Sequence, residues 1–529
     1  MKKIIYLLTG FWLITGSCDK KLDLKNPNAL TTGDYWKTKD QAFAGATAIY
    51  NALIVDGTYM RSFVGLTDSR GDDFTGDSPW LDLVLTGQFI IPTTSDPVFW
   101  IWRDFYLAVN RANQVIFYVS QYDESVLSTE QKNRIIGQAH FLRALAYYNL
   151  VTSFKVVPLI IDPIIDQKDF SAPTATEEVL WNQIYADLQA AETELPISYD
   201  NVDGPDNGQK GRATRGAAAG LLGKAYLYRK DYANAGAQFE KFISGPLKDV
   251  YSLMPDYRDN FKDINENNSE SLFEVQFAEG TGTDYNWTFD PTTSWKQVSA
   301  VAVTYGMEAA GFSDYLPTRW IYNEYKKEKT TDGKSDPRLL VTIASYEPDD
   351  NSVMAYGQPW IDFLTNHGVT DPTTRIYPRK YTNDGVGNGK KDELSPISSG
   401  INYRVLRYSD ILLMYAEVLN EAGRTAEAYP YIQQVRARAR LADLAVVRPN
   451  MSQQEMRDQL GHERALEFAI EGQRINDIIR WGWLYDAAKL AELKAHDPDF
   501  NTWTPGNEYL PVPQRELDVN KNILPNPAN

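Results

Sequence analysis

Cysteine is nearly absent from this chain, with Cys18 the single one among 529 residues. A lone cysteine cannot form a disulfide within the chain, so a disulfide scaffold is excluded and stability has to come from a hydrophobic core. Outside the N-terminus, no apolar run approaches the about 20 residues that a membrane-spanning helix requires. We therefore expect the main part of the chain to form a soluble body with a large core.

Basic residues are also in short supply. Lys and Arg number 53 against 70 Asp and Glu, which gives a formal net charge of −17. Nucleic-acid binding needs basic patches, so this balance argues against it. It also disfavours strongly acidic polysaccharides as ligands, although a local basic groove would override the net value.

The N-terminus has the pattern of a targeting segment. Lys2 and Lys3 precede an apolar run that is too short to span a bilayer permanently, and small residues stand directly before Cys18. We interpret residues 1–17 as a lipoprotein signal peptide and Cys18 as its lipidation site. Acyl chains hold a protein on a membrane with about 0.8 kcal/mol for each buried methylene. Residues 18–37 are polar and suit a tether.

Helical patterns cover residues 38–250 and 401–529. Leu222-Gly223 and Tyr226, followed by Ala235 and Phe239, have the spacing of a tetratricopeptide helix pair, and a degenerate copy begins at Tyr415. Small residues such as Gly223 let paired helices approach closely. We predict a tetratricopeptide-like helical scaffold over 38–250, interrupted by an inserted loop at 71–97, and a C-terminal helical region over 401–529.

The middle of the chain, residues 251–400, is rich in glycine, proline, asparagine and aromatics, and helical periodicity fades there. Long loops in a compact protein are usually functional or disordered, and the aromatic content argues against disorder. We predict a loop-rich, ligand-binding lobe with short strands, such as 271–277. The expected fold class is thus predominantly all-α, a helical repeat scaffold that carries an irregular lobe.

Several C-terminal motifs resemble the signature of the SusD/RagB family. They are the run 403–417, the segment from Glu463 to Phe468, Arg480-Trp481-Gly482 and the run 510–516. The resemblance implies a surface lipoprotein of the outer membrane that binds glycans for import. It also implies a partner, a SusC-type TonB-dependent transporter, over which the lipoprotein closes as a lid. A neutral oligosaccharide or polysaccharide is the expected ligand.

The same motifs also have a structural interpretation. Glu463, Glu467 and Glu471 recur every four residues and form a carboxylate row on a helix, with Arg464 and Arg474 available as cations. Such a row favours an ion-pair network that locks helices together over a catalytic role.

Aromatic residues in irregular sequence supply the candidate ligand contacts. Sugar rings stack on flat aromatic side chains, while their hydroxyls need polar partners. The first candidate is Trp80, with Asp73 among the nearby carboxylates. Tyr285, Trp287 and Trp295 form a second candidate surface, and Trp360 is a separate candidate. These residues complete the predicted ligand-binding set.

Catalytic and metal-binding signals are weak. His462-Glu463 begins like a zinc-protease motif, but Leu466 stands where the second histidine is required. Asp72, Asp73 and nearby acids do not match an EF-hand. We therefore expect a binding protein with no catalytic residues, metal or cofactor. Two alternatives stay open, a peptide-binding import lipoprotein of the RagB type and a glycoside hydrolase.

Overall fold

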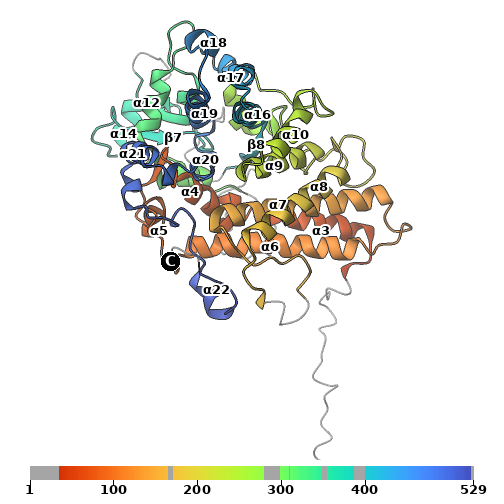
Figure 1. Cartoon of the computed structure of the whole chain (residues 1–529). Helices are drawn as coiled ribbons and strands as arrows, with labels where there is room; N and C mark the ends of the chain where they lie inside the picture. Colours follow the sequence, from red (N-terminus) through yellow and green to blue (C-terminus); the bar gives the residue numbers. More distant parts are fainter. Residues whose placement is uncertain are drawn as a thin grey trace, which may run out of the picture.

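The computed structural model describes residues 35–164, 171–278, 298–308, 310–347, 354–385 and 399–525. Helices predominate in these residues, and the strands are two to five residues long. Figure 1 shows α3 (Lys39–Asn51), α6 (Asp96–Val119), α7 (Thr129–Phe154) and α8 (Glu177–Glu194) together in the lower part of the view, with most of the C-terminal helices above them and α22 (Gln514–Val519) below α6. Helices α12 and α14, from the middle of the chain, lie among the C-terminal helices. The all-α fold class is confirmed.

The first half of the chain forms a stack of helices, each packed on the next. They are α3 (Lys39–Asn51), α6 (Asp96–Val119), α7 (Thr129–Phe154), α8 (Glu177–Glu194), α9 (Arg215–Tyr228) and α10 (Tyr232–Ile243). Thr38 and Ser128 begin α3 and α7 with capping boxes, in which side chain and backbone satisfy each other's hydrogen bonds. The small residue in the tetratricopeptide-like spacing allows close packing of the helix pair, as expected. A Cβ at Gly223 would lie 2.4 Å from the ring of Phe239.

The last quarter is helical as well. It comprises α16 (Tyr408–Glu421), α17 (Thr425–Arg438), α18 (Leu444–Val447), α19 (Gln453–Phe468), α20 (Arg474–Trp481), α21 (Ala487–His496), α22 (Gln514–Val519) and the 3-10 turns η6 (Trp483–Tyr485) and η7 (Pro498–Thr502). Gly423, just past α16, has a φ of +76°, which favours glycine after a helix end.

Short elements fill the segment between α3 and α6 and the segment between α10 and α16. They are η2 (Asp56–Met60), α4 (Ser62–Asp68), β1 (Phe74–Gly76), α5 (Leu81–Gly87), η4 (Tyr257–Phe261), η5 (Asp263–Asn265), β2 (Ser271–Val275), α11 (Val301–Tyr305), β3 (Tyr315–Pro317), α12 (Arg319–Lys327), α13 (Arg338–Thr342), β4 (Ile343–Ser345), β5 (Met354–Ala355), β6 (Gln358–Pro359), α14 (Trp360–Asn366), β7 (Ile376–Pro378) and β8 (Tyr403–Arg407). The strands pair in antiparallel couples, β1 with β3, β2 with β8, β4 with β7 and β5 with β6. Residues 71–97, which we expected to be a loop, thus contain a strand and a helix.

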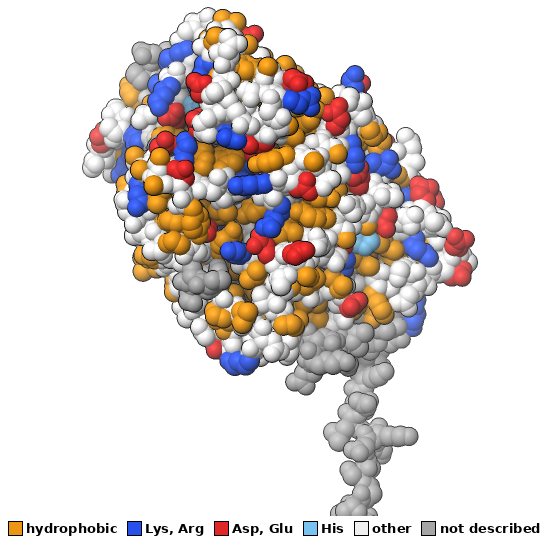
Figure 2. All heavy atoms as spheres, viewed as in Figure 1, with side chains coloured by type: hydrophobic (Ala, Val, Ile, Leu, Met, Phe, Trp, Pro, Cys, Tyr) orange, Lys and Arg blue, Asp and Glu red, His pale blue; other side chains and the backbone are white. Residues whose placement is uncertain are grey.

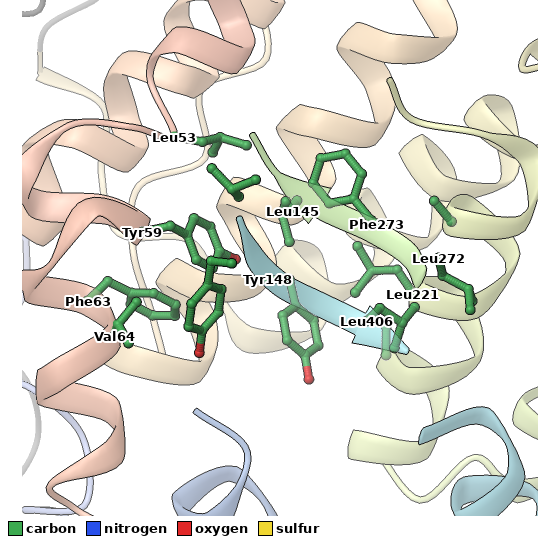
Figure 3. Packing of buried hydrophobic residues seen from close by; sticks show 14 of the residues in the cluster. Leu53, Tyr59, Phe63, Val64, Leu145, Tyr148, Leu221, Leu272, Phe273 and Leu406 are labelled. Carbon is green, nitrogen blue, oxygen red and sulfur yellow. The ribbon is translucent and has the colours of Figure 1, made fainter. Parts of the chain in front are cut away.

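The β2–β8 pair lies inside the main hydrophobic core. Figure 3 shows Phe273 and Leu272 of β2 and Leu406 of β8 among side chains of the N-terminal helices, including Leu145 and Leu221. A two-stranded pair is marginal alone, so this one depends on the helices packed around it. It connects the middle of the chain to the C-terminal region through the centre of the molecule.

The predicted carboxylate row is buried, and its geometry differs from the expectation in one respect. Glu463 and Glu467 lie on α19, but the helix ends at Phe468, so Glu471 follows it in a turn where Gly472 has a φ of +64°. The carboxylates of Glu463 and Glu467 are 0% exposed. Burial on this scale requires cations close by.

The cations that neutralise the row come mostly from other segments. Arg407 of β8 donates to Glu471 (2.8 Å) and Glu467 (3.0 Å). Arg338 of α13 donates to Glu463 at 2.7 Å, and Arg436 of α17 donates to the other oxygen of that carboxylate at 3.0 Å. The further cations are Arg438, which pairs with Glu467 and Glu270, and Lys380, which pairs with Glu471.

Our assignment of Arg464 and Arg474 to this network is therefore wrong. Arg464 donates to Asp477 (2.7 Å) and Asp410 (2.6 Å), and Arg474 donates to Asp72 (2.9 Å). Both arginines bridge other helices. Helical spacing identified the carboxylates but not their partners, since those are distant in sequence.

Removing one carboxylate from the network is expected to destabilise the fold strongly. Although burial alone raises the pKa of a carboxyl, Arg438, Arg407 and Arg338 hold the pKa of Glu467 well below its ordinary value. Glu467→Ala leaves these arginines without a shared partner and should lower the free energy of unfolding by about 3–5 kcal/mol, measured by urea denaturation at pH 7.

The matched control is Glu427→Ala, which removes a carboxylate paired with Arg424 at the surface, where Glu427 is 57% exposed. Exposed pairs contribute little, so the control should unfold like the parent chain. Equal, small effects of the two substitutions would contradict a structural role for the network.

Candidate functional site

Trp80 lies at the N-terminal end of α5 and is half-buried. Its ring centroid is 5.7 Å from that of Trp100 on α6, with the planes tilted by 55°. The guanidinium carbon of Arg61 lies 5.4 Å from the Trp80 ring centroid, within cation–π range. Three segments that are distant in sequence thus place two tryptophans and an arginine together. We call Trp80, Trp100 and Arg61 the aromatic platform.

Arg61 is held in place by a buried carboxylate. Its Nε donates to Asp56 Oδ1 at 2.7 Å, and a second bond joins Nη2 to Oδ2. Asp56 is 0% exposed, and burial raises its pKa although Arg61 opposes that effect. The neighbouring Gly57 is pressed against α6, where a Cβ would lie 2.1 Å from the carbonyl oxygen of Trp100. Only glycine fits that approach, so the η2 turn fixes Arg61 relative to Trp100.

The turn that carries Trp80 is fastened to the middle of the chain. Ser78 Oγ donates to Asp314 Oδ1 at 2.5 Å, and the backbone N–H of Asp77 donates to the Asp314 carbonyl oxygen at 2.8 Å. Large apolar side chains stay exposed beside these bonds, Leu81 at 61% and Phe312 at 50%. Leu81 directly follows Trp80, so an exposed apolar side chain adjoins the platform in sequence.

The other predicted ligand contacts have different fates. Trp360 is 1% exposed and packs in a separate small core, and its indole N–H donates to the Pro372 carbonyl oxygen at 2.7 Å. Asp73 is 2% exposed, and burial raises its pKa well above the ordinary value. Neither side chain is placed to contact a ligand at the surface. The remaining predicted residues, Tyr285, Trp287, Trp295 and Cys18, lie outside the described residues.

Sequence reasoning missed two members of the platform. Trp100 lies within the helical pattern of α6, yet it is only half-buried. Arg61 gave no signal at all, since its role depends on the η2 turn. A tryptophan on the partly exposed face of α6 was the one sign that the sequence offered.

Three described carboxylates around the platform are already bonded to neighbouring side chains. Asp56 pairs with Arg61, Asp104 pairs with Arg103, and Asp314 accepts from Ser78. They are 0%, 1% and 6% exposed. A glycoside hydrolase needs two carboxyl groups that both reach the scissile bond. These three buried carboxylates are not placed to serve that role.

Metal and membrane features can be tested over the same residues. Among the ranges given above, no three His, Cys, Asp or Glu side chains are grouped so that they could hold a metal ion. Within those ranges, no helix has both the length and the apolar character needed to cross a membrane. His462, the start of the zinc-protease-like motif, instead contacts two glutamates, with Nε2 2.9 Å from Glu328 and Nδ1 3.3 Å from Glu324.

Comparisons with known proteins cover both halves of the chain. The SusD family matches residues 269–528, and a family described as "Starch-binding associating with outer membrane" matches residues 22–227. The "SusD-like protein P2" of Formosa agariphila is 28% identical, with the alignment covering 99% of this chain and 98% of that protein.

Solved structures agree in fold. A SusD superfamily protein from Bacteroides vulgatus superposes with a TM-score of 0.79 at 27% identity, covering 94% of this chain and 100% of that one. A structure described as a "Laminarin binding SusD-like protein" superposes with a TM-score of 0.73 at 25% identity, covering 93% and 100%.

A structural role for His462 predicts a pH dependence. Burial alone lowers its pKa, but the hydrogen bonds to Glu324 and Glu328 outweigh burial and raise it to about 9. The charged imidazole therefore contributes stability that is complete below the unfolded-state pKa of about 6.5 and is lost as the pH rises through 9. His462→Gln should remove on the order of 2 kcal/mol at pH 6 and very little at pH 10, measured by urea unfolding across that range. A difference that does not change with pH would contradict this role.

Proposed function

The chain belongs to the SusD family, and on that premise we propose that it captures glycans at the cell surface and delivers them to a SusC-type TonB-dependent outer-membrane transporter, acting as its lid. The observation that carries the proposal is the aromatic platform of Trp80, Trp100 and Arg61. A relative of the same fold that is described as laminarin-binding supports a glycan as the ligand.

The platform has the chemistry that a sugar requires. The C–H faces of a sugar ring stack on tryptophan, and the hydroxyl groups need donors and acceptors at the margin of the ring. Arg61 and the Ser78–Asp314 pair supply such groups next to Trp80. Exposed Leu81 and Phe312 extend the apolar surface. An open surface of this kind suits a chain of sugar units, whereas peptide binding favours an enclosed cavity.

Capture proceeds without a chemical step in this proposal. Binding energy comes from stacking and hydrogen bonding, and the carboxylates beside Trp80 serve to hold Arg61 and the turn. For release, the glycan only has to pass from the platform to the transporter. Detection of hydrolysis products after long incubation with oligosaccharides would favour the glycoside hydrolase alternative.

The remaining elements of the proposal concern location. Cys18 is the expected lipid anchor, and residues 18–37 are the tether between the outer membrane and the folded body. The helical stack of α3, α6, α7 and α8 offers a broad face for the transporter. Figure 2 shows acidic and basic side chains interspersed with hydrophobic ones over the visible surface, a composition that suits reversible docking.

Replacing Trp80 tests the glycan-binding proposal. Trp80→Ala removes the stacking surface and should weaken the binding of neutral oligosaccharides by about tenfold or more, measured by calorimetric titration. Trp80→Phe keeps a flat ring and should retain part of the affinity. Tyr485→Ala is the control, since Tyr485 is an exposed aromatic (63%) on the η6 turn.

Mixed peptides belong in the same titration. Saturable peptide binding with every sugar silent would replace glycan import by peptide import. Sugar binding of equal strength in the parent chain and Trp80→Ala would remove the platform as the site.

Lipidation has its own test. Cys18→Ala should shift the protein from the membrane fraction to the soluble fraction, because the acyl chains that hold it on the bilayer cannot be attached. Mass spectrometry of the parent protein should find the acyl groups on Cys18. Extraction of the lipidated protein in mild detergent is expected to bring the transporter with it. Unchanged membrane association of the variant would contradict the anchor.

A further inference from the structure

A cleft of about 670 Å³ lies between α3, α6 and the segment that follows β2. Its described walls include Thr47 and Tyr50 of α3, Arg111 of α6, Arg212 and Gln276. The volume is within the range of small-molecule binding sites. The described members of the predicted ligand-binding set, Trp80, Asp73 and Trp360, do not line it.

Arg212 is fixed at the wall of this cleft by neutral partners. It donates to Gln209 at 2.7 Å, to Gln138 at 2.8 Å and to Thr47 at 3.0 Å. Its guanidinium carbon also lies 5.7 Å from the ring centroid of Tyr50. These groups orient the side chain but carry no negative charge. The positive charge of Arg212 is thus placed at the cleft without a carboxylate partner among the described residues.

Arg111 brings a second positive charge to the same wall. Its Nη1 donates to the Ala48 carbonyl oxygen at 2.6 Å and to Asn51 Oδ1 at 3.0 Å. Burial lowers the pKa of this arginine. Both cations are held by short bonds to α3, so their positions are set by the fold.

Charge in the cleft has one sign. Its described lining contains Arg111 and Arg212 and no aspartate or glutamate, although the whole chain carries a net charge of −17. Exposed charges beyond about 8 Å are largely screened at physiological salt, so the net charge of the chain has little effect on a ligand in the cleft. Their fork-shaped guanidinium groups match planar or multi-oxygen anions.

Helix α6 carries residues of both the cleft and the aromatic platform. Trp100, Leu107 and Arg111 are spaced by seven and four residues, which places them on one face of the helix, and all three are half-buried. At 1.5 Å per residue, the α-carbons of Trp100 and Arg111 are about 16 Å apart along the axis. The chain also links the cleft with the platform, because Asn51 at the end of α3 lines the cleft and Arg61, just after η2, belongs to the platform. One extended glycan can therefore reach both.

We propose that this cleft is a subsite for an anionic sugar unit, with Arg212 and Arg111 binding the carboxylate of a uronic acid or the sulfate ester of a sulfated sugar. The inference rests on the proposed glycan-binding function and specifies its ligand. The aromatic platform holds the neutral part of the chain, and the two arginines select for the anionic group.

The test compares three sets of oligosaccharides of matched length, neutral, uronate-bearing and sulfated, by calorimetric titration of the chain from residue 19 onward. At least one anionic set should bind about tenfold more tightly than the neutral set, because charge-assisted bonds to arginine are strong. The advantage should shrink as NaCl rises from about 0.05 to about 0.5 M. Which anionic set gains distinguishes a carboxylate from a sulfate ester.

Variants assign the effect to the cleft. Arg212→Gln should abolish the anionic advantage and leave neutral binding unchanged, while Arg212→Lys should keep part of it. Asn51→Asp adds a negative charge next to Arg111 with little change in shape and should also abolish the advantage. Arg424→Gln removes an exposed charge on α17 and is the control for net charge. Thermal midpoints of all variants show whether each one folds.

The outcomes separate this inference from the proposed function. Neutral and anionic sugars that bind equally, or an anionic advantage that survives both Arg212→Gln and Asn51→Asp, would overturn the anionic subsite and leave glycan capture standing. Failure of every sugar to bind would overturn both proposals.

Discussion

Burial of several carboxylates at one place in the core is the constraint on which the surrounding segments depend. Glu463 and Glu467 on α19 and Glu471 just after it need cations within hydrogen-bond reach, because an unpaired buried charge costs several kcal/mol. Those cations lie on β8, α13, α17 and the segment after β7. Satisfying the carboxylates therefore brings four separate parts of the chain to the same helix.

Bonds from the same region also hold the segment of chain that leads to Trp80. The backbone N–H of Gly472, next to Glu471, donates to Asp68 at 2.7 Å, and Asp68 also accepts from Tyr305. Arg474 donates to Asp72, whose pKa falls to about 2 because Arg474 outweighs burial. Asp68 ends α4, and Asp72 precedes β1. Since buried ion pairs give little net stability, their effect here is to fix position, and what they fix includes the turn that carries Trp80.

How far the sequence could predict this structure depends on whether the signal was local. Helical spacing located α9 with α10 and also the row of glutamates, because both patterns repeat within a few turns of one helix. The partners of the glutamates could not be found in that way, since Arg407 and Arg338 lie 60 and 129 residues from Glu467. For the same reason, the sequence could not predict which aromatic candidates are buried. Trp80 precedes the short helix α5 and Trp360 begins the short helix α14, and only tertiary packing leaves one ring half-buried and buries the other.

Specificity follows from the division between the aromatic platform and the cleft. A tryptophan ring stacks on the apolar face of many sugars, so in the function that we propose Trp80 and Trp100 retain a glycan without identifying it. Discrimination between sugars needs protein groups that cost free energy when the ligand leaves them unpaired, and this cost is largest for a charged group. Arg212 is preoriented by neutral side chains, so its charge is neither cancelled by the protein nor free to move. An anionic sugar then gains an ion pair in a cleft whose geometry is already set, whereas a neutral sugar of the same length gains only contacts with the platform.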